Sequence, residues 1–94
     1  MAPSSARHLR VCGHVQGVAF RYHTRSFALE RALTGWVKNL PDGSVEIHAE
    51  GPTEELDRLQ AWCEAGGPPA ARVSSVQAHP TAPRGCYHTF GIAV

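Results

Sequence analysis

The sequence predicts an α+β fold in which two helices cover one face of a mainly antiparallel sheet. Three observations support this prediction. Apolar and polar residues alternate over Ser44–Glu50, which is the pattern of a strand with one buried face. Apolar residues recur at helical spacing over residues 22–33 and again after Thr53. Glycines and prolines divide the chain into short segments, which follow one another as β-α-β-β-α-β and a last strand.

The first strand and the first helix are predicted from short apolar patterns. His8–Cys12 reads as a strand with Leu9 and Val11 on one face. Tyr22–Leu33 reads as a helix, and Gly35 is expected to end it. The apolar stripe that we expect this helix to bury consists of Tyr22, Leu29 and Leu33, with Ala28 and Ala32 beside them.

A hairpin is predicted in the middle of the chain. Trp36–Leu40 is its first strand, Pro41-Asp42-Gly43 its tight turn and Ser44–Glu50 its second strand. One face of the second strand is apolar and should be buried. The opposite face is expected to meet water, partly covered by Trp36, and it carries Ser44, Glu46, His48 and Glu50.

The second half of the chain predicts a helix and two more strands. Thr53 is expected to cap a helix that stops at residues 66–69, a Gly-Gly-Pro-Pro run. Its buried stripe consists of Leu56, Leu59, Trp62 and Cys63. Arg72–Ala78 is a further strand, residues 79–86 are a loop, and Tyr87–Val94 is the closing strand. This element order is that of the ferredoxin-like split β-α-β sandwich.

Size and charge limit the classes of function. A chain of 94 residues is expected to form a single domain with a small core. The net charge of +1 gives no strong field toward nucleic acid or a membrane surface. No apolar run is long enough to span a membrane and no secretory signal is visible, so we expect a cytoplasmic protein. Met1–Ala6 is small and polar, and a loose terminus is expected there.

The cysteines and histidines do not predict a metal site. Cys12, Cys63 and Cys86 are odd in number and form no CxxC pair, so free thiols are expected. The six histidines are dispersed, and none forms the i, i+4 pair that places two metal ligands on one helix face. These residues therefore predict no metal site.

The turn between the first strand and the first helix has the composition of an anion-binding loop. Gly13 and Gly17 lie four residues apart, and Arg21 follows. Glycines allow successive N–H groups to point to one place, and the helix N-terminus adds partial positive charge there. Arg21 would add a forked, permanently charged donor. Spacing alone fits equally well a βα turn beside a solvated arginine.

Two motifs resemble the signature sequences of the acylphosphatase family. The first is Gly13-x-Val15-Gln16-Gly17-Val18-x-Phe20-Arg21, and the second is Gly35-Trp36-Val37-Lys38-Asn39-x-x-x-Gly43-x-Val45, followed by Gly51. Residues 68–73 and Phe90-x-Ile92 also resemble that family. The resemblance covers nearly the whole chain and implies that residues 1–94 are one acylphosphatase-like domain. It further implies a small monomeric hydrolase, without metal or cofactor, that cleaves acyl phosphates into a carboxylate and inorganic phosphate.

The resemblance also assigns the site residues. Arg21 matches the family's phosphate-binding arginine, and Asn39 matches its water-orienting asparagine. The family's anion-cradling loop matches Val15, Gln16, Gly17, Val18, Ala19 and Phe20. The implied partners are a small acyl phosphate and, as ligands, inorganic phosphate or sulfate, with neither nucleic acid nor membrane. The roles of His14 and His23 stay open.

The chemistry that these residue types allow is consistent with that assignment. A carboxylate leaving group, whose conjugate acid has a pKa of about 4, departs without a proton, so no general acid is needed. Positioning and charge stabilisation remain as the main tasks. The amide of Asn39 cannot act as a base near neutrality, but it can orient a water. Without the motifs, Asn39 would be expected to bond its own backbone, Arg21 to form a surface ion pair and Phe20 to anchor the loop in the core.

Four other functions fit these residues less well than this assignment. An RNA-binding module would need aromatic residues on its central strands, which here carry His8, Arg10, Cys12, Glu46, His48 and Glu50. A metal carrier of similar fold would need paired cysteines in the first loop, and the first loop here has none. Hydrogenase-maturation carbamoyltransferases begin with an acylphosphatase-like domain, but their chains are much longer, which favours the free enzyme. A phosphate-binding module without turnover would not need Asn39.

Overall fold

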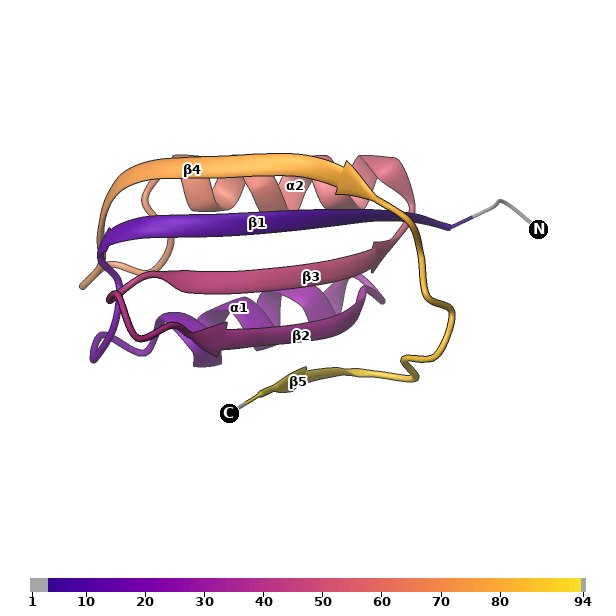
Figure 1. Cartoon of the computed structure of the whole chain (residues 1–94), viewed down its shortest axis with the longest axis horizontal. Coiled ribbons are helices and arrows are strands. Elements are labelled where there is room, and N and C mark those ends of the chain that lie inside the picture. Colours follow the sequence, from indigo (N-terminus) through magenta and orange to yellow (C-terminus); the bar gives the residue numbers. More distant parts are fainter. Residues whose placement is uncertain (1–3, 94) are drawn as a thin grey trace.

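The computed structural model describes residues 4–93 as one five-stranded sheet with two helices on the same face (Figure 1). The strands are β1 (Ser5–His14), β2 (Thr34–Asn39), β3 (Val45–Gly51), β4 (Arg72–Thr81) and β5 (Phe90–Ile92), in the order β4-β1-β3-β2-β5. The helices are α1 (Phe20–Glu30) and α2 (Thr53–Glu64). Only the pairing of β2 with β5 is parallel among these strands. The predicted α+β, ferredoxin-like fold is confirmed.

The core lies between the sheet and the two helices. The apolar side chains of the alternating strand β3 point into it, as predicted. The stripe of α2 meets them, with Trp62 half-buried beside the core. The fully buried residues that these two patterns predicted are Val45, Ile47, Ala49, Leu56, Leu59 and Cys63. Phe20 joins them from the start of α1, which confirms its expected place in the core.

Strand β1 is longer at both ends than its apolar pattern indicated. Residues 1–3 of the expected loose terminus lie outside the described residues, whereas Ser5 and Ala6 belong to β1 and Ala6 is buried. At the other end, a bulge after Cys12 carries the strand on to His14. The physical reason is tertiary, because Ser5 pairs with β3 at one end and residues 12–14 pair with β4 at the other.

The predicted apolar stripe of the first helix is wrong in three of its five members, because Ala32 lies exposed after the end of α1 and Tyr22 and Leu29 are exposed as well. Tyr22 and Leu29 are 64% and 46% exposed, respectively. The face that α1 buries consists instead of Phe20, Thr24 and Ala28, which follow one another at i, i+4 spacing. The hydroxyl of Thr24 donates to the carbonyl of Phe20 at 2.8 Å, so a polar residue sits in the core with its bond satisfied.

Gly35 does not end the first helix. Helix α1 stops at Glu30, and the chain turns through Ala32, whose φ is +56°. Gly35 lies in β2, where a Cβ atom would stand 1.9 Å from the carbonyl oxygen of His48. The glycine is therefore needed for close approach of two strands, not for a helix cap.

The remaining boundaries shift by a few residues. Thr53 is the first residue of α2 rather than its cap, and its hydroxyl is 2.9 Å from that of Ser5. Strand β4 continues to Thr81 because Thr81 still pairs with Ala6 of β1. Strand β5 is limited to Phe90–Ile92, and Val94, which was predicted to be part of it, lies outside the described residues.

Part of the polar face of the hairpin is covered rather than open to water. His48 and Glu50 are buried, with Glu50 only 4% exposed. The segment between β4 and β5 crosses this face, where the N–H groups of Arg84 and Gly85 donate to the Glu50 carboxylate at 2.7 and 3.1 Å. The His48 ring approaches the same carboxylate at 2.7 Å. Glu50 thus fixes the crossing that brings β5 beside β2.

Replacing Glu50 by Gln is expected to lower the free energy of unfolding by about 1–3 kcal/mol, the usual cost of leaving a buried polar group poorly paired. Burial alone would raise the pKa of Glu50, but the Arg84 N–H, the His48 ring and the Gly85 N–H together hold it below its ordinary value of 4.5. A carboxyl with a lowered folded pKa stabilises the fold above its unfolded pKa and stops doing so as the pH falls through the folded pKa.

Urea unfolding at pH 7 and pH 3 measures this effect. The difference between the wild type and Glu50→Gln should be largest at pH 7 and smaller at pH 3. Glu54→Gln is the matched control, because Glu54 is exposed on α2 and accepts no hydrogen bond from a described side chain. Equal stability of the two variants at pH 7 would contradict the role given to Glu50.

Candidate active site

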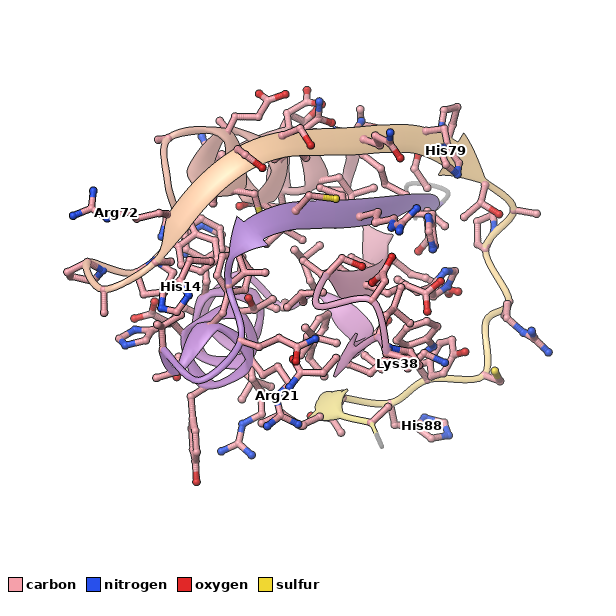
Figure 2. All side chains as sticks on the ribbon, turned by 60° about the vertical axis from the view of Figure 1, so that its left-hand side comes forward. His14, Arg21, Lys38, Arg72, His79 and His88 are labelled. Atoms are coloured by element: carbon pink, nitrogen blue, oxygen red, sulfur yellow. The ribbon has the colours of Figure 1, made fainter. Side chains whose placement is uncertain are left out.

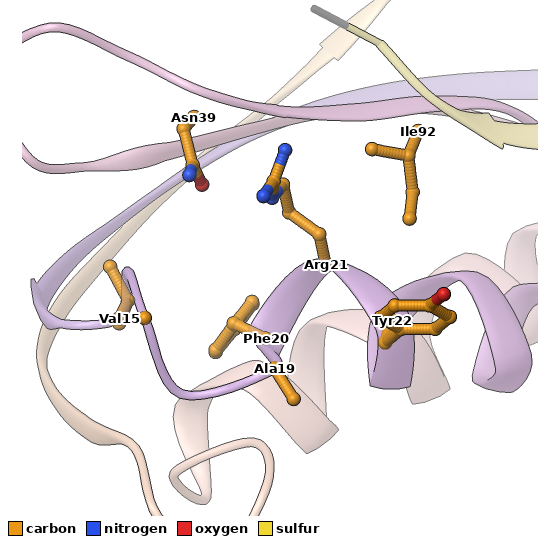
Figure 3. A pocket seen from close by; sticks show the side chains of 8 residues that line it. Val15, Ala19, Phe20, Arg21, Tyr22, Asn39 and Ile92 are labelled. Atoms are coloured by element: carbon orange, nitrogen blue, oxygen red, sulfur yellow. The ribbon is translucent and has the colours of Figure 1, made fainter.

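A small pocket opens at the end of the sheet where β1 leads into α1 (Figure 3). Its volume is about 140 Å³, which is well below the roughly 300–1,000 Å³ of pockets that enclose a drug-sized ligand. The loop, the start of α1, the end of β2 and strand β5 all contribute to its wall. The lining residues are Val15, Gly17, Ala19, Phe20, Arg21, Tyr22, Asn39 and Ile92.

The loop presents backbone donors at the start of a helix. Gly17 and Ala19 both have positive φ angles, +75° and +62°, and Ala19 occupies the N-cap position without a side-chain cap. The first helical bond runs from His23 N–H to the Ala19 carbonyl. Within residues 4–93, the N–H groups of residues 16–22 donate to no other backbone group. Such a helix N-terminus is suited to an anion.

Arg21 adds a full positive charge to this pocket. Its guanidinium extends across the cavity and lies between Asn39 and Ile92 (Figure 3). No described carboxylate forms an ion pair with it, whereas Arg7, Arg10 and Arg58 each have one. Arg21 is therefore not the surface ion-pair residue that its position alone could have indicated, and its donors face the pocket.

Asn39 closes the opposite wall from the last position of β2. Its Oδ1 atom is buried and has no hydrogen-bond partner among the described residues. A buried acceptor without a partner costs about 1–3 kcal/mol relative to a paired one. The side chain does not bond its own backbone through this oxygen, so the acceptor is available to a molecule in the pocket.

Gln16 joins the loop to the hairpin that carries Asn39. Its Nε2 atom donates to the carbonyls of Leu40 and Ser44 at 2.8 and 2.9 Å. The hairpin turn is itself held by the N–H of Leu40, which donates to Ser44 at 2.8 Å. Asp42 accepts from the hydroxyl and the N–H of Ser44 and from Arg10, and these bonds lower its pKa to about 2. The two walls of the pocket are thereby fixed relative to each other.

The structure brings six of the eight predicted site residues into one pocket: Val15, Gly17, Ala19, Phe20, Arg21 and Asn39. The other two do not line it, since the side chain of Gln16 points to the hairpin and Val18 packs against the core. Phosphate binding by this loop stays a prediction.

Two lining residues, Tyr22 and Ile92, were not predicted as site residues. The position of Tyr22 directly after Arg21 could have indicated that it lines the site, but the helical pattern of apolar residues predicted that it is buried in the core. His14 and His23 are exposed and do not line the pocket. His14 pairs with Arg72 at the edge of the sheet, apart from Arg21 (Figure 2).

The cysteines lie apart from the pocket and are free thiols. Burial, with a smaller effect of the nearby Glu64 charge, raises the pKa of Cys63 to about 12, so this thiol is unreactive at neutral pH. The described part of the chain contains no group of three or more His, Cys, Asp or Glu side chains placed to hold a metal ion. Neither described helix is long and apolar enough to cross a membrane.

Known proteins are similar to this chain in both sequence and fold. The acylphosphatase family model matches residues 7–92. The acylphosphatase of Methylococcus capsulatus is 47% identical over 85 residues, which cover 90% of this chain and 91% of that protein. An acylphosphatase structure from Coxiella burnetii superposes with a TM-score of 0.90 at 40% identity, covering 96% of this chain and 93% of that one. The crystal structure of acylphosphatase from Bacillus subtilis gives 0.89 at 37% identity, over 96% and 99% of the two chains. The matched range spans the positions of the loop, Arg21 and Asn39, and the chain belongs to the acylphosphatase family.

Proposed function

We propose that this protein hydrolyses acyl phosphates to a carboxylate and inorganic phosphate. The observation that carries the proposal is the buried Oδ1 of Asn39, which has no hydrogen-bond partner among residues 4–93. It shares one small pocket with the loop and with the guanidinium of Arg21, with which no described carboxylate forms an ion pair. An acceptor for water and a set of anion donors are together what this hydrolysis needs. The loop, Arg21 and Asn39 of one chain supply both the anion donors and the water acceptor, so we propose that the protein acts as a monomer.

The phosphoryl group binds at the loop. Backbone N–H groups at the start of α1 and the guanidinium of Arg21 donate to its oxygens. The positive φ angles of Gly17 and Ala19 shape the loop, and Phe20, buried against Trp62 at 5.5 Å between ring centroids, anchors it to α2. These fixed donors stabilise the charge on the phosphoryl oxygens in the transition state without reorganising.

Asn39 orients the attacking water. Its Oδ1 accepts a hydrogen bond from the water, whose oxygen then attacks phosphorus while the bond from phosphorus to the acyl oxygen breaks. No carboxylate or histidine of residues 4–93 lines the pocket, so a phosphoryl oxygen takes the proton of the water. The carboxylate leaves unprotonated because its conjugate acid, with a pKa of about 4, is ionised near neutral pH.

Acetyl phosphate and benzoyl phosphate should both be hydrolysed, and the rate should be unchanged by a strong chelator, because Arg21 and the loop supply the positive charge. Inorganic phosphate should inhibit competitively, since product and substrate share the group that the loop binds. Added salt should weaken this inhibition by screening. Steady-state kinetics with and without chelator and phosphate provide the measurement. Activity that is lost with the chelator and restored by magnesium or zinc would contradict the proposal.

A further inference from the structure

Gln16 belongs to the anion loop, but its side chain is turned away from the pocket. Its Nε2 atom donates to the carbonyls of Leu40 and Ser44 at 2.8 and 2.9 Å. An amide nitrogen carries two N–H bonds and both partners are acceptors, so these contacts use both donors. While the contacts last, the side chain has no donor left for a phosphoryl oxygen. The proposed phosphate and water sites therefore leave the Gln16 side chain without a role.

The two carbonyls lie where the central hairpin leaves the sheet. Asn39 forms the last pair of the ladder between β2 and β3. Leu40 and Ser44 are the next residues on the two sides of that pair, and the turn beyond them is exposed at positions 41 and 42. The end of a ladder opens more readily than its middle, because it has fewer buried contacts. The amide of Gln16 therefore holds together the end of the ladder at which Asn39 lies.

The loop has other anchors, whereas this clamp connects the loop to the hairpin. Val15 and Phe20 are buried and Val18 packs against the core, so the loop keeps its place without the Gln16 side chain. Arg10 contacts the turn from β1. Among the described side chains, Gln16 is the one that bonds the turn to the loop. The distance between the loop and Asn39 thus depends on Gln16.

Resting on the proposed function, we propose that Gln16 is a positioning residue, whose amide holds Asn39 at the distance from the loop that lets its water reach phosphorus. In phosphoryl transfer the attacking and leaving oxygens lie roughly in line, and a displacement of about 1 Å can cost on the order of a hundredfold in rate. Phosphate binding does not need this distance, because Arg21 and the loop N–H groups stay in place. The Gln16 side chain should therefore affect kcat and not phosphate affinity.

The test is a double-mutant cycle of Gln16→Met and Asn39→Ala. Benzoyl phosphate gives kcat for the folded fraction of each variant, and calorimetric titration gives the Kd of inorganic phosphate. Met keeps the length of the side chain and removes both donors. Gln16→Asn is the second variant, because its amide is one methylene shorter and cannot reach both carbonyls. Gln60→Met is the matched control: Gln60 joins α2 to β1, accepting from Arg7 and donating to Glu64, and does not line the pocket.

Gln16→Met and Gln16→Asn should each lower kcat roughly tenfold and keep the phosphate Kd within about twofold. In the Asn39→Ala background, Gln16→Met should lower kcat by less than about twofold, because no oriented water is left to be misplaced. Gln60→Met also loses its side-chain hydrogen bonds between two elements, and it should keep both kcat and the phosphate Kd within about twofold.

An unchanged kcat in both Gln16 variants would overturn the positioning role. An equal loss of kcat with and without Asn39 would also overturn it, because Gln16 would then act independently of the water. A phosphate Kd that weakens in parallel with kcat would overturn it by assigning the side chain to the phosphoryl site. A wild type that hydrolyses neither benzoyl nor acetyl phosphate would instead refute the proposed function, and the role of Gln16 with it. The activity of the wild type thus distinguishes the two failures.

Discussion

Arg21→Ala should lose both phosphate binding and hydrolysis. The guanidinium is the only full positive charge that the described residues place in the pocket, and no described carboxylate competes for it. A charge-assisted hydrogen bond contributes about 1.5–3 kcal/mol, so we expect phosphate to bind about 10- to 150-fold more weakly. The loss in kcat/KM should be at least as large, because the charge on the phosphoryl oxygens is stabilised in the transition state as well. Calorimetric titration with phosphate and steady-state kinetics measure the two effects.

Arg25→Ala is the matched control for this prediction. It removes the same charge one turn later on α1, from a half-buried side chain that does not line the pocket, and should keep phosphate affinity within about twofold because Arg25 contributes no donor to the pocket wall. Arg21→Lys should recover little, since an ammonium group cannot reproduce the fork of a guanidinium. If Arg21→Ala and Arg25→Ala lowered phosphate affinity equally, phosphate would depend only on the overall positive charge of α1 and not on a direct contact with Arg21.

Local signals in the sequence were sufficient for the hairpin, the fold class and most of the pocket wall. Alternation in Ser44–Glu50 and the turn residues at positions 41–43 specify strand pairing over a short distance, and the structure has both. The motif positions from Val15 to Arg21 are contiguous, so they reach the site together. Asn39 joins them because β2 ends beside the loop, an outcome of the sheet order.

The errors arose where tertiary contacts decide. A helical period marked Tyr22 and Leu29 as core, but α1 is rotated so that Phe20, Thr24 and Ala28 face inward. Helical periodicity predicts that one face of α1 is apolar, but it does not show which face is buried. The burial of Phe20 in the core decides which face of α1 turns toward the sheet.

The burial of His48 and Glu50 was equally hidden from the sequence. It depends on a crossing segment more than 30 residues away that donates two N–H groups to Glu50. No local pattern reports such a contact. The same reasoning applies to Gln16, whose bonds to the hairpin join two segments that are far apart in the chain.

Asn39→Ala should lose about a hundredfold or more in kcat while phosphate affinity stays within a few fold. The expected magnitude is that of removing one group that positions or stabilises reacting atoms. Phosphate affinity should persist because Arg21 and the loop remain. The free energy of unfolding should be unchanged or higher, since the substitution removes a buried acceptor, Oδ1, that has no partner among the described residues.

Lys38→Ala is the control on the same strand, because the Lys38 side chain contacts Glu46 and Trp36 and does not line the pocket. Lys38→Ala should retain kcat within about twofold if Asn39→Ala acts by losing the oriented water and not by disturbing β2.

Asn39→Gln tests the positioning role further, because it restores the same amide atoms one methylene farther out. If the position of the amide matters, most of the loss in kcat should persist in this variant. Full activity in Asn39→Gln would show that an amide is needed but its position is not. If Asn39→Ala abolished phosphate binding while Arg21→Ala preserved it, the two residues would have exchanged roles and the proposed mechanism would be wrong.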